Sequence, residues 1–174
     1  NIPLDPSGFY LTTWSAEAGL ADGRYVIRIK ANDTIDVGPD NQNASVFVNI
    51  TIDNTPPTTT DDSDLSEPWY GTDQTITLTC VDNLVGCNVT LYCVYDDGTT
   101  PCTPTIAGTT VSVTCPDGST CVRRIRYFSN DTLNNIESIR NSSRIKIDKH
   151  SPSITIDSPL NGTTKSGLID LLTT

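Results

Sequence analysis

The sequence has no methionine, a single histidine and few basic residues. None of its apolar runs approaches the about 20 residues that a transmembrane helix needs, so this segment is not expected to insert into a membrane. Its 11 Lys and Arg stand against 21 Asp and Glu, a formal net charge of −10. Nucleic-acid binding depends on clustered Lys and Arg and is therefore not expected. The first residue, Asn1, predicts an interior or processed piece of a longer protein.

Recognisable catalytic motifs are also missing. The only histidine, His150, lies beside Ser151 in a linker that contains proline, where a passive role is far more common than a role as a base. No Gly-rich phosphate loop and no nucleophile elbow is present. A carboxylate pair stays open as an alternative, although nothing in the pattern directs two carboxylates into one pocket. We therefore predict a protein that is not an enzyme and that needs neither a cofactor nor a metal.

Ser and Thr are abundant instead, at 42 of 174 residues, and with the apolar β-branched residues they favour strands over helices. The sequence therefore predicts an all-β fold. Six cysteines fall within one stretch that has no C-x-x-C motif and no Cys–His cluster, which favours disulfides in an oxidising compartment over free or metal-bound thiols. These cysteines are Cys80, Cys87, Cys93, Cys102, Cys115 and Cys121.

The chain repeats itself at an interval of about 95 residues, the size of an immunoglobulin-like sandwich. The segment from Arg24 to Thr34 is similar to the segment from Val122 to Thr132, and Asn49 to Pro57 is similar to Arg144 to Pro152. Apolar and polar residues alternate in these segments, which is typical of antiparallel sheets with one wet face. We therefore predict tandem immunoglobulin-like β-sandwiches.

One sandwich is predicted to be complete and another to be split between the chain ends. Residues 58–152 form the complete one, residues 1–57 the C-terminal part of another, and residues 153–174 the opening strands of the next. A partial sandwich exposes unpaired backbone groups and an apolar face. Neighbouring copies, or consecutive repeats of one polypeptide, are expected to supply the missing strands. The strands expected in the complete sandwich are Thr75–Val81, Asn88–Tyr95, Thr110–Thr114, Val122–Ser129 and Ser143–Asp148.

Three motifs of the central region carry a family resemblance. The first holds Asp82, Asn83 and Gly86, the second Tyr127, Ser129, Asp131, Asn135 and Glu137, and the third Ile147, Asp148 and Pro152. They resemble the Ig-like repeats of bacterial and archaeal surface proteins, a type also found beside chitobiase-like catalytic domains and in outer-membrane surface proteins. Trp14 and the segment ADGRYVIRIKAND resemble a related Ig-like type. Asn134 replaces a glycine of the family pattern, and Asn tolerates a left-handed backbone better than most residues.

Each adjacent pair of cysteines flanks a short predicted turn. Six cysteines allow 15 connectivities. Hairpin partners bring their Cα atoms to about 5.5 Å, which suits a disulfide. We therefore favour Cys80–Cys87, Cys93–Cys102 and Cys115–Cys121. The alternative is a bridge between sheets, as in antibody domains, which is disfavoured because Ile125 or Tyr127 holds the inward position of the late strand.

The chain has seven N-x-S/T sequons, where its 13 asparagines would give about three by chance. This excess favours N-linked glycans on a surface protein and, with the repeats, an archaeal source; Asn- and Thr-rich turns are the alternative explanation. Asn49 lies opposite the apolar stripe of its strand, where a glycan would fit. The sequons are at Asn32, Asn43, Asn49, Asn88, Asn130, Asn141 and Asn161.

Two acidic groups and three aromatic residues stay open to two interpretations. The acidic groups are solvated loops or Ca²⁺ ligands that stiffen the joint between repeats, with the first interpretation favoured. The aromatic residues pack at the core or edge, or stack on sugars, again with the first favoured. The acidic groups are Asp61, Asp62 and Asp64, and Asp33, Asp36 and Asp40; the aromatic residues are Trp14, Trp69 and Tyr70.

Together these features predict a structural segment of an extracellular, glycosylated repeat protein or filament at the cell surface. It is expected to assemble head to tail, by strand complementation or by tandem repetition. The alternative is an adhesin, or a carbohydrate-binding accessory module of a secreted enzyme.

Overall fold

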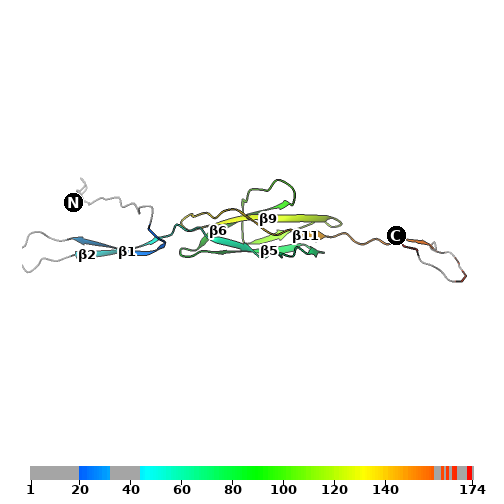
Figure 1. Cartoon of the computed structure of the whole chain (residues 1–174), viewed down its shortest axis with the longest axis horizontal. Coiled ribbons are helices and arrows are strands. Elements are labelled where there is room, and N and C mark those ends of the chain that lie inside the picture. Colours follow the sequence, from blue (N-terminus) through cyan, green and yellow to red (C-terminus); the bar gives the residue numbers. More distant parts are fainter. Residues whose placement is uncertain are drawn as a thin grey trace, which may run out of the picture. The chain divides into compact units, whose positions relative to one another are not determined.

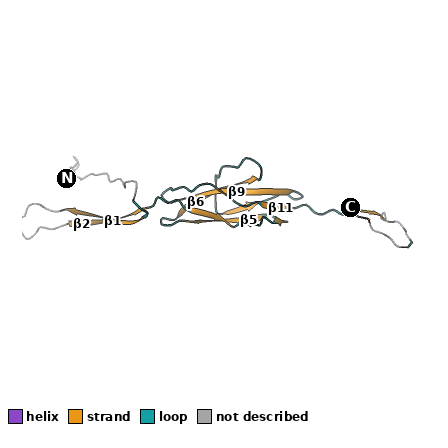
Figure 2. Ribbon diagram, viewed as in Figure 1, coloured by secondary structure: helices purple, strands orange, loops and turns teal. Residues whose placement is uncertain are grey.

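The structure, a computed structural model, describes residues 20–31, 44–158, 162, 164, 166–167 and 172–173. Within these residues the chain forms strands, turns and loops but no helix (Figure 2), so the all-β prediction is confirmed. The strands are β1 (Gly23–Ala31), β2 (Ala44–Ile52), β3 (Thr58–Asp61), β4 (Trp69–Tyr70), β5 (Gln74–Val81), β6 (Cys87–Asp96), β7 (Ile106–Ala107), β8 (Thr110–Val113), β9 (Thr120–Asp131), β10 (Arg140–Asn141), β11 (Ile145–Asp148), β12 (Ile156–Ser158) and β13 (Leu172–Thr173). Among the described residues there is no helix long and apolar enough to cross a membrane.

The strands are arranged in two larger sheets and two hairpins (Figure 1). One larger sheet has the order β3-β5-β8, and the other has the order β4-β11-β9-β6-β7, with β10 paired to β9. Most neighbours are antiparallel, as in β5–β8 and β9–β11, but β4 runs parallel to β11. The hairpins are β1–β2 and β12–β13.

The apolar core takes residues from both larger sheets, as in a β-sandwich. On β5, Ile76 and Leu78 are buried while Thr75, Thr77 and Thr79 are exposed, which is the alternation that the sequence predicts. Burial of each such aliphatic side chain contributes about 1.5–3 kcal/mol to folding. The other buried residues of this core are Val111 and Val113 of β8, Cys115, Ile125 and Tyr127 of β9, and Ile145 and Ile147 of β11.

All five strands predicted for the central sandwich are present, with ends that differ by no more than two residues. Four strands were not predicted: β3, β4, β7 and β10. Each has two to four residues. Such segments are too short for alternation to reveal, because a period of two needs several repeats before it stands out.

The β1–β2 hairpin gathers apolar side chains on one of its faces. Its register pairs Ile27 with Val48 and Ile29 with Val46. Arg28, on the opposite face, lies 5.5 Å from the centre of the Phe47 ring. Ile29 remains 57% exposed and Val46 58% exposed, so this apolar face is only partly covered.

The chain forms two compact units. One comprises Asn1–Thr60, Thr79–Leu91 and Phe128–Ile139, and the other comprises Asp61–Leu78, Tyr92–Tyr127 and Arg140–Thr174. The strands β5, β6 and β9 each contribute residues to both units. The division into sandwiches at residues 57 and 152 stays a prediction.

Three disulfides close short segments of the chain. They join Cys80 to Cys87, Cys93 to Cys102, and Cys115 to Cys121, across 7, 9 and 6 positions of sequence. These are the pairs that the sequence favours, and none of the six cysteines is free. The expected hairpin geometry holds only for Cys93–Cys102, beside the paired strands β6 and β7. The other two bridges connect successive strands of different sheets, β5 with β6 and the segment after β8 with β9, so the hairpin argument was wrong for them. Their presence indicates an oxidising, extracellular type of environment.

Candidate functional site

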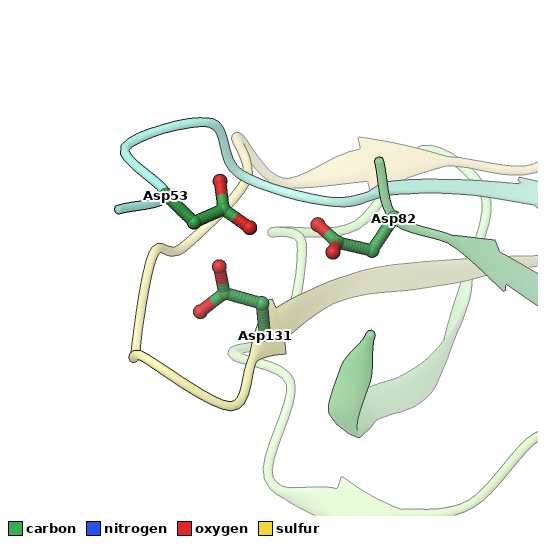
Figure 3. Close-up of side chains that lie close together, drawn as sticks. All are labelled: Asp53, Asp82 and Asp131. Carbon is green, nitrogen blue, oxygen red and sulfur yellow. The ribbon is translucent and has the colours of Figure 1, made fainter. Parts of the chain in front are cut away.

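Three aspartates from distant parts of the sequence converge at the ends of three strands. Asp53 follows β2, Asp82 follows β5, and Asp131 is the last residue of β9. One carboxylate oxygen from each lies within 4.8 Å of the others. Figure 3 shows the three carboxylates turned toward one another across a small gap. Asp53 is 6% exposed, Asp131 is fully buried, and Asp82 is partly buried.

The turn after β5 holds Asp82 in place. Its Oδ2 accepts backbone hydrogen bonds from Leu84 at 3.0 Å, Val85 at 2.9 Å and Gly86 at 2.7 Å. The Cys80–Cys87 disulfide closes the same turn. Burial alone would raise the pKa of Asp82, but the backbone N–H groups of this turn outweigh it and hold the pKa below its usual 3.8. The other oxygen, Oδ1, is buried and has no hydrogen-bond partner.

The turn after β9 holds Asp131 in the same manner. Its Oδ1 accepts hydrogen bonds from the backbone of Leu133 at 2.9 Å and of Asn135 at 2.8 Å, and its Oδ2 accepts one from the Asn135 side chain at 2.7 Å. The turn requires a left-handed residue, and Asn134 supplies it with a φ of 68°. Asn134 thus adopts the left-handed backbone that Asn tolerates better than most residues.

Asp53 is joined to this turn through its main chain. The Asn135 side chain, which also donates to Asp131, donates a hydrogen bond to the backbone carbonyl oxygen of Asp53 at 3.0 Å. The carboxylate Oδ1 of Asp53 accepts one hydrogen bond, from the backbone of Thr55 at 3.1 Å. Oδ2 is buried without a partner, like Oδ1 of Asp82. The cluster therefore holds two buried carboxylate oxygens whose hydrogen-bonding capacity is unused.

Other residues of the second motif form a buried polar network next to the cluster. Glu137 accepts backbone hydrogen bonds from Thr59 at 3.0 Å and from Ser129 at 2.8 Å. The Ser129 hydroxyl lies 2.6 Å from the Thr59 hydroxyl and 2.7 Å from that of Thr90. These contacts fasten β3 to β9 and β6, so this part of the motif has a structural role.

The predicted acidic group of Asp61, Asp62 and Asp64 does not form a cluster. Asp61 accepts a hydrogen bond from the Tyr127 hydroxyl at 2.6 Å, and Asp62 accepts one from the backbone of Thr77 at 2.7 Å. Asp64 accepts two from Ser66, which lower its pKa. Asp64 thus stabilises a turn, whereas Asp61 and Asp62 connect to strands β9 and β5. The choice between a solvated loop and calcium ligands stays a prediction for this group. The second group, Asp33, Asp36 and Asp40, lies outside the described residues.

The remaining candidate residues are placed as follows. Trp69 is 55% exposed, and the Lys146 ammonium lies 5.7 Å from the centre of its ring, a cation–π geometry. Tyr70 packs against the apolar core. The ring Nδ1 of His150 lies 3.1 Å from the carbonyl oxygen of Gly118. Trp14 lies outside the described residues.

Four of the seven sequons fall on described residues. Asn49, Asn88 and Asn141 are exposed. Asn130 is partly buried, and its side chain accepts a hydrogen bond from the backbone of Val89 and donates one to Asn134. The side chain of Asn141 accepts one from the Tyr95 hydroxyl, at 3.3 Å. Glycosylation stays a prediction for all seven, and Asn32, Asn43 and Asn161 lie outside the described residues.

The cluster of Asp53, Asp82 and Asp131 was not predicted from the sequence. The sequence does contain one feature that the three share, because each aspartate ends a strand or directly follows one. Sequence spacing gives no indication that these three strand ends meet, because that depends on strand order. No family model matches the chain, and no curated protein matches it.

Proposed function

We propose that this chain is a structural segment of an extracellular, glycosylated protein of Ig-like repeats, which forms a stalk or filament at the surface of an archaeal cell. Its role is to extend and stiffen that surface structure. The exposed sequons at Asn49, Asn88 and Asn141 support attachment of glycans, and the disulfides support an oxidising location.

The order of the strands supports an immunoglobulin-like fold. Immunoglobulin sandwiches place strands A, B and E in one sheet and strands C, F and G in the other. Taken in sequence, β3, β5 and β8 stand for A, B and E, while β6, β9 and β11 stand for C, F and G. The two observed sheets contain these two sets.

The path of the chain along β9 carries the proposal of a linear array. β9 begins at Thr120, which pairs with Asp148 at the end of β11. It ends at Asp131, whose carboxylate lies near that of Asp53, just before β3. The chain therefore comes in beside one end of this 12-residue strand and departs beside the other. In the array that we propose, successive repeats would connect at these two places.

The β1–β2 hairpin supports association with further strands. Its apolar face, with Ile29 and Val46 more than half exposed, needs a cover to become a stable core. Residues 153–174 of a neighbouring copy, or strands of an adjoining repeat, would supply that cover in the assembly that we propose. Such strand addition combines main-chain hydrogen bonds with side-chain burial.

Antibody labelling of the source cells tests the location. We expect an antibody raised against residues 58–152 to label intact cells as strongly as permeabilised cells. Glycosidase treatment should reduce the apparent mass of the labelled protein. Labelling that requires permeabilisation would overturn the proposal.

An adhesin or a carbohydrate-binding accessory module is the second candidate, favoured by the exposed ring of Trp69. The Lys146 ammonium over that ring competes with a sugar for the same surface. A glycan array separates the two candidates. We expect no glycan to be retained, and saturable binding that the Trp69→Ala substitution abolishes would favour the second candidate.

A further inference from the structure

We propose that Asp53, Asp82 and Asp131 together bind one calcium ion. This inference goes beyond the proposed function and does not depend on it, because it rests only on the geometry and chemistry of the three side chains. The ion would tie the segment after β2 to the turns after β5 and β9.

The spacing of the ligand oxygens fits a single calcium ion. Oxygen ligands lie about 2.3–2.6 Å from Ca²⁺, so two oxygens on opposite sides of the ion are about 4.6–5.2 Å apart. The three candidate oxygens lie within 4.8 Å of one another. One ion can therefore contact all three, and water would complete the six to eight ligands that Ca²⁺ takes.

The unsatisfied carboxylate oxygens are the second, independent observation. Oδ2 of Asp53 and Oδ1 of Asp82 are buried without a hydrogen-bond partner, and Asp53 as a whole is 6% exposed. Figure 3 shows these side chains directed into the shared gap. A buried charge without a partner is costly, and a bound cation removes that cost. In the described part of the chain, no Lys or Arg forms an ion pair with any of the three.

The rest of the local structure leaves these oxygens available. Backbone N–H groups of the two turns occupy the other oxygen of Asp82 and orient the carboxylate of Asp131. Asn135 holds the turn after β9 to the main chain of Asp53. The Cys80–Cys87 disulfide restrains the turn that carries Asp82. The site is thus pre-organised, which lowers the entropy cost of binding.

The donor set selects the class of ion. It consists of hard carboxylate oxygens, with no imidazole or thiolate, so it does not favour zinc or copper. Mg²⁺ demands near-ideal octahedral geometry at about 2.0–2.1 Å and gives up its water reluctantly. Carboxylates fixed on three separate segments suit the longer and more flexible coordination of Ca²⁺ better.

Calorimetric titration and thermal unfolding of the oxidised 174-residue chain, freed of metal with a chelator, test the inference. We expect one Ca²⁺ per chain with a dissociation constant of about 10⁻⁴–10⁻³ M, as in extracellular modules. A calcium concentration ten times that constant should raise the melting temperature by about 3–6 °C. The absence of binding heat and of any such rise would overturn the proposal, as would an equal response to MgCl₂.

Substitution of Asp53 separates calcium binding from a structural role. Asp53→Asn keeps the shape of the side chain and removes one of three neighbouring negative charges. In the presence of chelator we expect this variant to melt at the same temperature as the unchanged chain or at a higher one. Its calcium affinity should fall more than it does when a residue that only supports a metal ligand is replaced, which costs about 10–100-fold. Asp82→Asn gives a second measure if the first variant folds poorly.

Asp117→Asn is the matched control, because it removes the same charge from a fully exposed side chain that is not part of the cluster. Its calcium response should equal that of the unchanged chain to within about twofold, since exposed charges are screened by salt. An unchanged response in both Asp53→Asn and Asp82→Asn, or an equal loss in Asp117→Asn, would contradict the assignment.

Discussion

The side-chain amide of Asn135 donates a hydrogen bond to the backbone carbonyl of Asp53, which lies 82 positions earlier in the chain. The same amide donates a second hydrogen bond to the carboxylate of Asp131. One polar side chain thus joins the segment between β2 and β3 to the turn after β9. The sequence motif that contains Asn135 therefore forms a turn and also binds the segment between β2 and β3 through hydrogen bonds.

Removal of the two hydrogen bonds that the Asn135 side chain donates should destabilise the folded chain. The Asn135→Ala substitution leaves acceptors of Asp53 and Asp131 without their donor, and we expect a loss of about 1–3 kcal/mol in the free energy of unfolding. Urea denaturation followed by circular dichroism measures it. Asn134→Gly is the control, because glycine accepts the positive φ at that position, and it should change stability much less. Equal effects of the two substitutions would contradict this role of Asn135.

Each disulfide should stabilise the chain through a short closed loop. For loops of about 7–10 residues, the chain-entropy model gives roughly 2–3 kcal/mol for each bridge. Replacement of Cys93 and Cys102 by Ser should lower the free energy of unfolding by that amount. Peptide mapping without reduction should recover three locally cross-linked segments, and a peptide that joins Cys80 to Cys115 or Cys121 would show that the assigned pairing is wrong.

The ion pair of Lys149 with Asp73, at 2.8 Å, should produce a defined dependence of stability on pH. The hydrogen bond from Lys149, followed by that from the Cys115 backbone, holds the pKa of Asp73 below its usual 3.8. Because the folded pKa is the lower one, the stabilisation is present above pH 3.8 and is lost as the pH falls through the folded value. The hydrogen bond to Asp73 raises the pKa of Lys149 above its usual 10.5. The stabilisation that the charged Lys149 contributes is therefore lost only as the pH rises through that higher pKa.

Comparison with the Asp73→Asn variant measures this effect. The unchanged chain should be the more stable of the two at pH 7, and the difference should shrink as the pH falls below 3.8. Asp117 is the exposed and more distant partner of Lys149. The Asp117→Asn variant should therefore differ less from the unchanged chain in its free energy of unfolding at pH 7. A difference between the unchanged chain and Asp73→Asn that is constant from pH 7 to pH 2 would rule out this linkage.

Glycans on natively produced protein should follow the exposure of the asparagine side chains. Asn49 and Asn88 are exposed on strands, and we expect both to carry glycans. Asn130 uses both ends of its amide in hydrogen bonds and should be modified less. Mass spectrometry of glycopeptides decides this, and bare asparagines at all seven sequons would remove the support for a surface glycoprotein. Material from a bacterial expression host is not suitable for this measurement.

The longer strands and the local disulfides could be predicted from the sequence because both depend on neighbours along the chain. Alternation located β5 and β9, and the turn residues between Cys80 and Cys87 indicated a local disulfide, although β5 and β6 lie in different sheets and do not form the expected hairpin. The parallel pairing of β4 with β11 and the approach of Asp53 to Asp82 depend on contacts between remote segments. Alternation and turn composition carry no information about such contacts, so these features were missed.

Photo-cross-linking tests the proposed assembly most directly. Ile154, which is 78% exposed, is replaced by a photoreactive residue. The substituted chain is prepared in unlabelled and in ¹⁵N-labelled form, and the two forms are mixed in equal amounts. Head-to-tail assembly predicts cross-linked peptides that join position 154 of one isotope to β1 or β2 of the other. Cross-links between these segments that occur only within one isotope would show that residues 153–174 fold back on their own chain, and would contradict the account.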